Sequence, residues 1–127
     1  MKRIVVDLDH TLTIDASAGY ADATPNRAVI RKLQEYKAQG FEIVISTSRN
    51  MRTYAGNLGK INVHTLPTVL DWLRRHEVPC DEVYVAKPWC GKDGFYIDDR
   101  AVRPSEFVDL SYEQILELIQ AKKNRDN

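Results

Sequence analysis

The chain has 127 residues, the length of one ordinary domain, which is enough to enclose a hydrophobic core. Its 18 basic and 18 acidic residues cancel, so the broad positive surface that is typical of nucleic-acid-binding proteins is not expected. The apolar run near the start is too short for a signal peptide or a membrane span, and we expect a cytoplasmic protein with no membrane partner. The two cysteines, Cys80 and Cys90, have no metal-binding spacing, and we expect reduced thiols.

The first predicted strand covers residues 3–8, RIVVDL, because a short apolar run rich in β-branched residues is typical of a parallel strand that is buried on both faces. Residues 13–24 are rich in small and turn-forming residues, which predicts a loop or flap. Thr24 is then expected to cap a helix with Pro25 at its first position, ending at Gly40. The apolar stripe of this helix consists of Val29, Ile30, Leu33 and Tyr36.

Three further strands are predicted along the rest of the chain. They cover residues 41–47, residues 81–87 and, in a short segment, residues 94–99. A polar, glycine-containing connection after the first of these leads into a helix over residues 66–77.

A capping box at Ser111 and Gln114 predicts the start of a terminal helix. Its apolar residues are Ile115, Leu116, Leu118 and Ile119. Because strands alternate with helices, we expect right-handed crossovers and a three-layer α/β/α, Rossmann-like parallel sheet in a single domain over residues 1–127.

Polar residues gather at the ends of the predicted strands, which is where ligands bind in parallel sheets. These residues are Asp7 and Asp9, the hydroxyl run Ser46, Thr47 and Ser48, then Lys87, and finally Asp98 and Asp99. Four carboxylates on one rim repel one another unless a cation lies among them. Magnesium suits such oxygen ligands and completes its shell with water and phosphate, while a lysine and a hydroxyl suit the oxygens of a phosphoryl group. The pattern therefore predicts magnesium-dependent phosphoryl transfer.

The same segments resemble the four motifs of the haloacid dehalogenase-like phosphatases. DLDHT, residues 7–11, is similar to the DxDxT signature, and IVISTSR, AKP and YIDDR are similar to the second, third and fourth motifs in the same order. Beyond the motifs, most of the chain resembles the small phosphatases associated with capsular polysaccharide biosynthesis. The resemblance implies the haloacid dehalogenase-like fold without a cap domain. A capless site would be open unless a neighbouring subunit covered it, so we expect a homodimer or tetramer.

The resemblance also implies roles for individual residues. Asp7 would be the nucleophile that forms an aspartyl-phosphate, and Asp9 would be the general acid and then the base for water. Lys87 would pair with Asp7 and the phosphate. Thr47 would hydrogen-bond a phosphoryl oxygen, and it is preferred over its serine neighbours because its T-x-R spacing to Arg49 resembles related phosphatases.

For the metal, the resemblance implies four ligands or supporting residues. Asp7 would bind through its carboxylate and Asp9 through its backbone carbonyl. Asp98 would be the second metal carboxylate, and Asp99 would orient a metal-bound water.

Five residues near the strand ends are candidates for substrate binding: Ser48, Arg49, Arg52, Trp89 and Lys92. Arg49 and Arg52 are equally compatible with binding substrate and with simply beginning a helix. The leading hypothesis is a magnesium-dependent phosphomonoesterase acting on a small phosphorylated metabolite, a sugar or polyol phosphate in the biosynthesis of capsular or other surface polysaccharide. The alternatives are a polynucleotide 3'-phosphatase, which the balanced charge disfavours, and an inactive phosphate-binding module, which an intact Asp9 disfavours.

Overall fold

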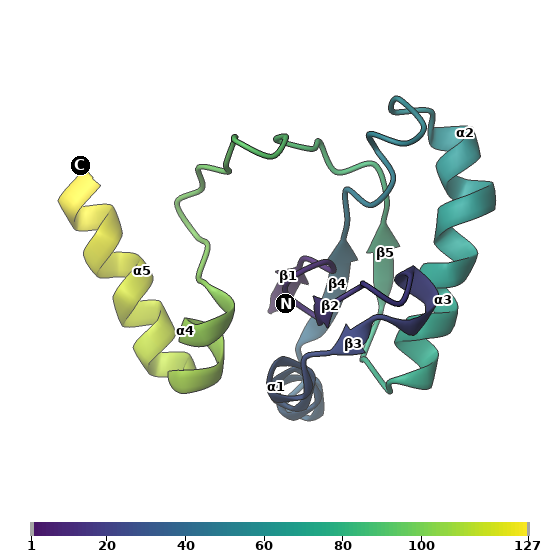
Figure 1. Cartoon of the computed structure of the whole chain (residues 1–127). Coiled ribbons are helices and arrows are strands. Elements are labelled where there is room, and N and C mark those ends of the chain that lie inside the picture. The colour runs from purple at the N-terminus through teal and green to yellow at the C-terminus, as the bar shows by residue number, and fades with distance from the viewer. Residues whose placement is uncertain (1, 127) are drawn as a thin grey trace. The chain divides into compact units, whose positions relative to one another are not determined.

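The computed structural model describes residues 2–126 (Figure 1). The chain divides into two compact units, Met1–Trp89 and Cys90–Asn127. Among residues 2–126, every helix is too short or too polar to span a bilayer.

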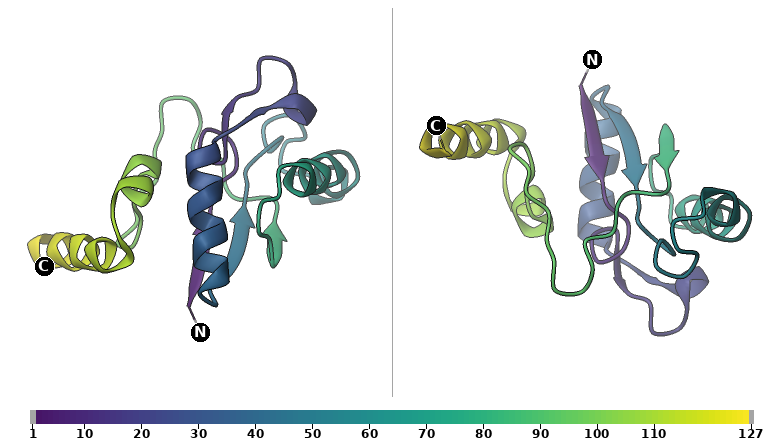
Figure 2. Two further views of the ribbon diagram at one scale, coloured as in Figure 1. Left: turned by 90° about the horizontal axis from the view of Figure 1, so that it is seen from below. Right: turned by 90° about the horizontal axis from the view of Figure 1, so that it is seen from above.

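A three-stranded parallel sheet forms the centre of the first unit, in the order β1-β4-β5. These strands are β1 (Arg3–Val6), β4 (Glu42–Ser46) and β5 (Glu82–Tyr84). Helix α1 (Arg27–Ala38) lies between β1 and β4 in the chain, and α3 (Leu66–Arg75) lies between β4 and β5 (Figures 1 and 2). The prediction of an α/β fold with a parallel sheet is confirmed, and three of the four predicted strands are present.

Part of the core is formed by α1 and the strand β4, and α3 contributes further buried residues. The predicted stripe of α1 is buried, with Leu33 fully inaccessible, and Ile43 and Ile45 of β4 are also fully buried. The sheet also carries an ion-pair network in which Arg3 contacts Glu42 and Glu82, each at 3.0 Å. On β1 the expectation of burial on both faces is wrong within this unit, since Val5 is 65% exposed.

Helix α1 begins two residues later than predicted. Its N-cap is Asn26, whose side-chain oxygen accepts a hydrogen bond from the backbone N–H of Val29 at 3.4 Å. Thr24 and Pro25 instead form the short strand β3 (Thr24–Pro25). The predicted cap at Thr24 is therefore wrong, because strand pairing holds its backbone in an extended conformation and Asn26 supplies an equally good capping side chain.

The predicted loop over residues 13–24 contains more structure than expected. Strand β2 (Thr13–Asp15) pairs with β3 in an antiparallel hairpin, and a 3₁₀ turn, η1 (Tyr20–Asp22), lies between them. We call residues 13–25 the flap. Two side chains of α3 hold it: the Trp72 indole N–H donates to the Ala23 carbonyl at 2.9 Å, and the Arg75 guanidinium donates to the Ala21 carbonyl. The flap is thus an anchored element.

Helix α3 is preceded by a short helical turn, α2 (Leu58–Lys60), and by a π-helical stretch, η2 (Ile61–Thr65). Asn57 caps α2 by accepting a hydrogen bond from the backbone N–H of Lys60 at 3.1 Å. Three apolar residues of α3 are buried, Val69, Trp72 and Leu73, whereas Leu70 is 48% exposed.

The second unit is helical, with α4 (Pro104–Asp109) and α5 (Tyr112–Asp126). The predicted capping box is confirmed: the Ser111 hydroxyl accepts from the backbone N–H of Gln114 at 3.2 Å, and the Gln114 side chain accepts from that of Ser111 at 2.8 Å. Glu106 of α4 pairs with Lys122 of α5 at 3.9 Å.

The predicted strand over residues 94–99 is wrong, since this segment has no strand structure. A strand needs a neighbour that satisfies its backbone N–H and C=O groups, and the described part of the second unit contains no strand. The alternating apolar side chains remain accessible, with Phe95 77% and Ile97 91% exposed.

Candidate functional site

Asp7 follows directly after β1, and its carboxylate lies 3.7 Å from the Lys87 ammonium. The Asp7 side chain is 36% exposed, so the pair lies at the surface rim of the first unit. Burial raises the pKa of Asp7 above its ordinary value of 3.8, and the nearby charge of Asp9 adds to this rise, while Lys87 opposes it. The structure therefore combines a partly desolvated carboxylate with one fixed cation, an arrangement suited to a reactive group.

Asp9 is held separately, by Arg49. The Nε and Nη2 groups of Arg49 donate to the two carboxylate oxygens of Asp9, at 3.1 and 2.7 Å. Such a bidentate contact fixes the plane of the carboxylate as well as its position. Leu8, between the two acids, is fully buried, so it anchors the segment from which both carboxylates project.

The ends of β4 and β5 are tied together by backbone hydrogen bonds that bring Thr47 beside Lys87. The N–H of Thr47 donates to the carbonyl of Tyr84 at 2.9 Å, and the N–H of Lys87 donates to the carbonyl of Thr47 at 3.1 Å. Thr47 is 1% exposed, and its hydroxyl oxygen accepts from the backbone N–H of Arg49 at 3.1 Å. Because the oxygen is the acceptor in that contact, the hydroxyl hydrogen is available for donation.

Three residues next to these groups have left-handed backbones without being glycine. His10, after Asp9, has φ of 62°, Asn50, after Arg49, has φ of 63°, and Ala86, before Lys87, has φ of 66°. Non-glycine residues in this region store about 1–3 kcal/mol of strain, and they cluster at functional sites. In this unit they redirect the chain at the positions that carry Asp9, Arg49 and Lys87.

An aromatic side chain of the flap covers Arg49. The guanidinium carbon lies 4.2 Å from the centroid of the Tyr20 ring, and the Arg49 side chain is only 1% exposed. Sequence reasoning missed Tyr20, because nothing in the local sequence of the flap distinguishes it from a surface tyrosine. It also identified Arg49 only as a substrate-binding candidate, although the structure shows it paired with Asp9.

The expected metal ligands do not form one cluster among the described residues. Among residues 2–126, no three His, Cys, Asp or Glu side chains are gathered closely enough to hold a metal ion. Asp98 and Asp99 belong to the second unit, where both are exposed and Asp98 accepts a hydrogen bond from the backbone N–H of Arg100 at 2.9 Å. The first unit contributes Asp7 and Asp9, whose hard oxygen donors fit magnesium in kind.

The remaining substrate-binding candidates are scattered. Ser48 is half-buried beside Thr47, whereas Arg52 is exposed on the following turn. Trp89, at the end of the first unit, is 50% exposed, and Lys92 is exposed in the second unit. The structure thus brings together five of the predicted site residues: Asp7, Asp9, Thr47, Arg49 and Lys87. Of the other substrate-binding candidates, only Ser48 is adjacent in sequence to a member of this group.

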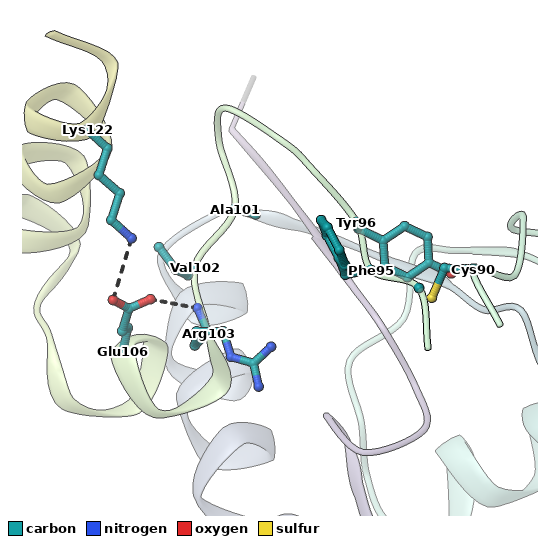
Figure 3. Close-up of a pocket in the computed structure, with 9 residues that line it drawn as sticks. Cys90, Phe95, Tyr96, Ala101, Val102, Arg103, Glu106 and Lys122 are labelled. Atoms are coloured by element: carbon teal, nitrogen blue, oxygen red, sulfur yellow. Dashed lines mark hydrogen bonds and ion pairs between the residues drawn. The ribbon is translucent and has the colours of Figure 1, made fainter. Parts of the chain in front are cut away.

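The second unit contains a pocket of its own (Figure 3). Its lining includes the rings of Phe95 and Tyr96, the backbone around Val102, and the side chain of Glu106, which accepts from the Arg103 backbone N–H at 2.8 Å. Glu106 also pairs with Lys122, so this carboxylate is engaged by two groups of the same unit (Figure 3). Its lining contains none of the candidate catalytic, metal-binding or substrate-binding residues named from the sequence.

Comparison with known proteins found no matching family model and no matching curated protein. A crystal structure of a structural-genomics target from Vibrio cholerae is similar to this chain, with 58% sequence identity and a TM-score of 0.94. The match covers 96% of this chain and 99% of the other. The name of that protein states no activity. This identity and coverage show that the chain belongs to the same family as the Vibrio cholerae protein.

Proposed function

We propose that this protein is a magnesium-dependent phosphomonoester hydrolase of the haloacid dehalogenase-like type, acting through an aspartyl-phosphate. The observation that carries the proposal is the pairing of two carboxylates at one strand end with two different cations. Asp7 lies 3.7 Å from Lys87, and Asp9 is held by Arg49. Two acids kept apart in this way can take two different roles in one reaction.

In the first step, a carboxylate oxygen of Asp7 would attack phosphorus while the bond to the leaving oxygen breaks. Asp9, which is paired with Arg49 as a carboxylate, would accept a proton as the phosphate monoester binds and then give it to that oxygen, which departs as an alcohol. In the second step, water would attack the aspartyl-phosphate and pass its proton to Asp9. This releases inorganic phosphate and restores both acids. Lys87 and the Thr47 hydroxyl would hold the phosphoryl oxygens throughout.

The proposed magnesium ligands are the carboxylates of Asp7 and Asp98 and the backbone carbonyl of Asp9, with Asp99 orienting a bound water. The ion would supply positive charge against the phosphoryl oxygens. The position of Asp7 supports this assignment, because its carboxylate follows directly after β1 and is 36% exposed, which leaves hard oxygen donors accessible to the ion.

The proposed substrate is a sugar or polyol phosphate, in keeping with the resemblance to capsular polysaccharide phosphatases. The zero formal net charge supports a small substrate over a polyanion. We also propose a homodimer or tetramer, since a capless site needs another source of desolvation. Sedimentation velocity would measure the mass in solution, and a strictly monomeric protein would contradict this part.

Phosphate release from a panel of phosphorylated sugars, polyols and related metabolites, with magnesium present, tests the activity. The matched pair of variants is Asp7→Asn and Asp109→Asn, since Asp109 is an exposed carboxylate at the end of α4 in the second unit. We expect release by the wild type and by Asp109→Asn, and none by Asp7→Asn. Absence of release from every member by the wild type would refute the proposal.

A further inference from the structure

The side chain of Arg49 sets the orientation of Asp9, and few contacts hold Arg49 itself in place. Arg49 presents one edge of its planar fork, Nε and Nη2, to the carboxylate. Its remaining group, Nη1, is buried and has no hydrogen-bond acceptor among the described residues. A buried donor without a partner is rare and destabilising, so hydrogen bonding does not secure this corner of the guanidinium.

The face of the guanidinium is secured instead by the flap. The ring of Tyr20 lies 4.2 Å from the guanidinium carbon, within the range of a cation–π contact. Tyr20 is itself 43% exposed, so packing around its own ring does little to fix it. Its position follows from the anchoring of the flap to α3, through Trp72 to Ala23 and Arg75 to Ala21.

We propose that Tyr20 is a positioning residue that keeps Arg49 against Asp9. The structure then contains a chain of contacts from α3 through the flap to the acid beside the nucleophile. The consequence for catalysis rests on the proposed function, in which Asp9 protonates the leaving oxygen. A misplaced Asp9 would matter most when the leaving group needs that proton, and little when it departs readily as an anion.

Two variants separate the contribution of the Tyr20 ring from the contributions of its apolar bulk and its hydroxyl. Tyr20→Phe keeps the ring face and removes only the hydroxyl, whereas Tyr20→Leu keeps apolar bulk and removes the ring. Both changes are at a partly exposed position, so both variants should fold, and thermal unfolding followed by circular dichroism checks this.

The first readout does not require turnover. The Nε–H signal of Arg49 in proton–nitrogen correlation spectra, identified by its loss in Arg49→Lys, reports the hydrogen bond to Asp9. We expect its exchange with water to stay slow in Tyr20→Phe and to become faster, with broadening, in Tyr20→Leu; a change of chemical shift alone follows from loss of the ring current and is not counted. Slow exchange retained in Tyr20→Leu would overturn the positioning role, whether or not the protein is a phosphatase.

The second readout is kcat/KM for two substrates, 4-nitrophenyl phosphate, which has a good leaving group, and an alkyl phosphate, which has a poor one. We expect Tyr20→Leu to lose about three- to thirtyfold on the alkyl phosphate and no more than about twofold on the aryl phosphate, with Tyr20→Phe close to the wild type on both. An equal loss on both substrates would indicate general loosening and overturn the inference. Inactive wild type on both would refute the proposed function, and the spectroscopic result would still decide the role of Tyr20.

Discussion

Arg49 and Asp9 form a bidentate ion pair in which the arginine side chain is almost wholly buried, 1% exposed, while the aspartate is 27% exposed. The pair joins the segment after β4 to the segment after β1, which are 40 residues apart in the sequence. Because the arginine is the buried partner, the aspartate supplies the charge that makes its burial tolerable.

Replacing Arg49 should destabilise the fold. Arg49→Gln would leave the buried site partly filled and Asp9 without its cation, and we expect the free energy of unfolding to fall by about 2–4 kcal/mol. Urea unfolding of this variant beside Arg52→Gln, which alters an exposed arginine three residues away, makes the comparison. Equal stabilities of the two variants would show that the ion pair contributes little.

The strands of the first unit could be predicted because parallel strands appear as continuous apolar runs, and those at residues 3–8 and 41–47 contain β1 and β4. The same rule failed at residues 94–99, since an apolar alternation cannot show whether a partner strand is present. The preference for threonine followed by proline at the start of a helix predicted a cap at Thr24. In the structure, pairing of β2 with β3 instead holds this backbone in an extended conformation.

The candidate site was predictable to the extent that strand ends determine it. Sheet order places Asp7 and Lys87 on one rim, so their contact follows from topology. The contact of Tyr20 with Arg49 does not follow from topology. It depends on the anchoring of the flap on α3, and no local sequence pattern predicts a contact between residues so far apart in the chain.

Asp7→Asn should remove activity without reducing stability. The pKa of Asp7 is raised in the folded protein, so this group favours folding below its unfolded pKa, and that contribution is lost as pH rises through the folded value. At neutral pH the ionised carboxylate is therefore slightly destabilising, and in metal-free buffer the neutral variant should unfold at an equal or higher urea concentration. Turnover within about tenfold of the wild type would remove Asp7 from the nucleophile role.

Chelation should stop hydrolysis, and magnesium should restore it. Calcium should substitute poorly, because its larger and looser shell holds the phosphate differently. Asp98→Asn should raise the magnesium concentration needed for half-maximal activity, whereas Asp93→Asn, a nearby exposed carboxylate, should not. Full activity of metal-stripped protein would contradict the magnesium assignment, and identical requirements in both variants would remove Asp98 from the ligand set.

Asp81 should make stability depend on pH at the acidic end. Its carboxylate accepts from the backbone N–H of Ile43 at 2.8 Å and pairs with Lys37 at 2.7 Å, and these contacts lower its pKa from 3.8. A lowered folded pKa contributes stability above the unfolded value, which is lost as pH falls through the folded one. Asp81→Asn should therefore lose stability at pH 7 and show a flatter dependence on pH below 4, measured by thermal unfolding. Parallel curves for both proteins would contradict this role.

The substrate class can be tested through the salt dependence of binding. The phosphate donors available near Asp7 are few, chiefly Lys87 and Thr47, so a small sugar or polyol phosphate should bind with weak dependence on ionic strength. A single-stranded polynucleotide would need several phosphate contacts, and its affinity would fall with a slope of about −0.7 per contact against the logarithm of salt concentration. We expect kcat/KM for a phosphorylated sugar or polyol to be well above kcat/KM for a 3'-phosphorylated oligonucleotide. The value for the small substrate should change little between low and moderate salt. The opposite ranking, with a steep slope on the oligonucleotide, would replace the polysaccharide hypothesis with an end-processing one, because only a polyanion held at several points releases enough counterions to produce that slope.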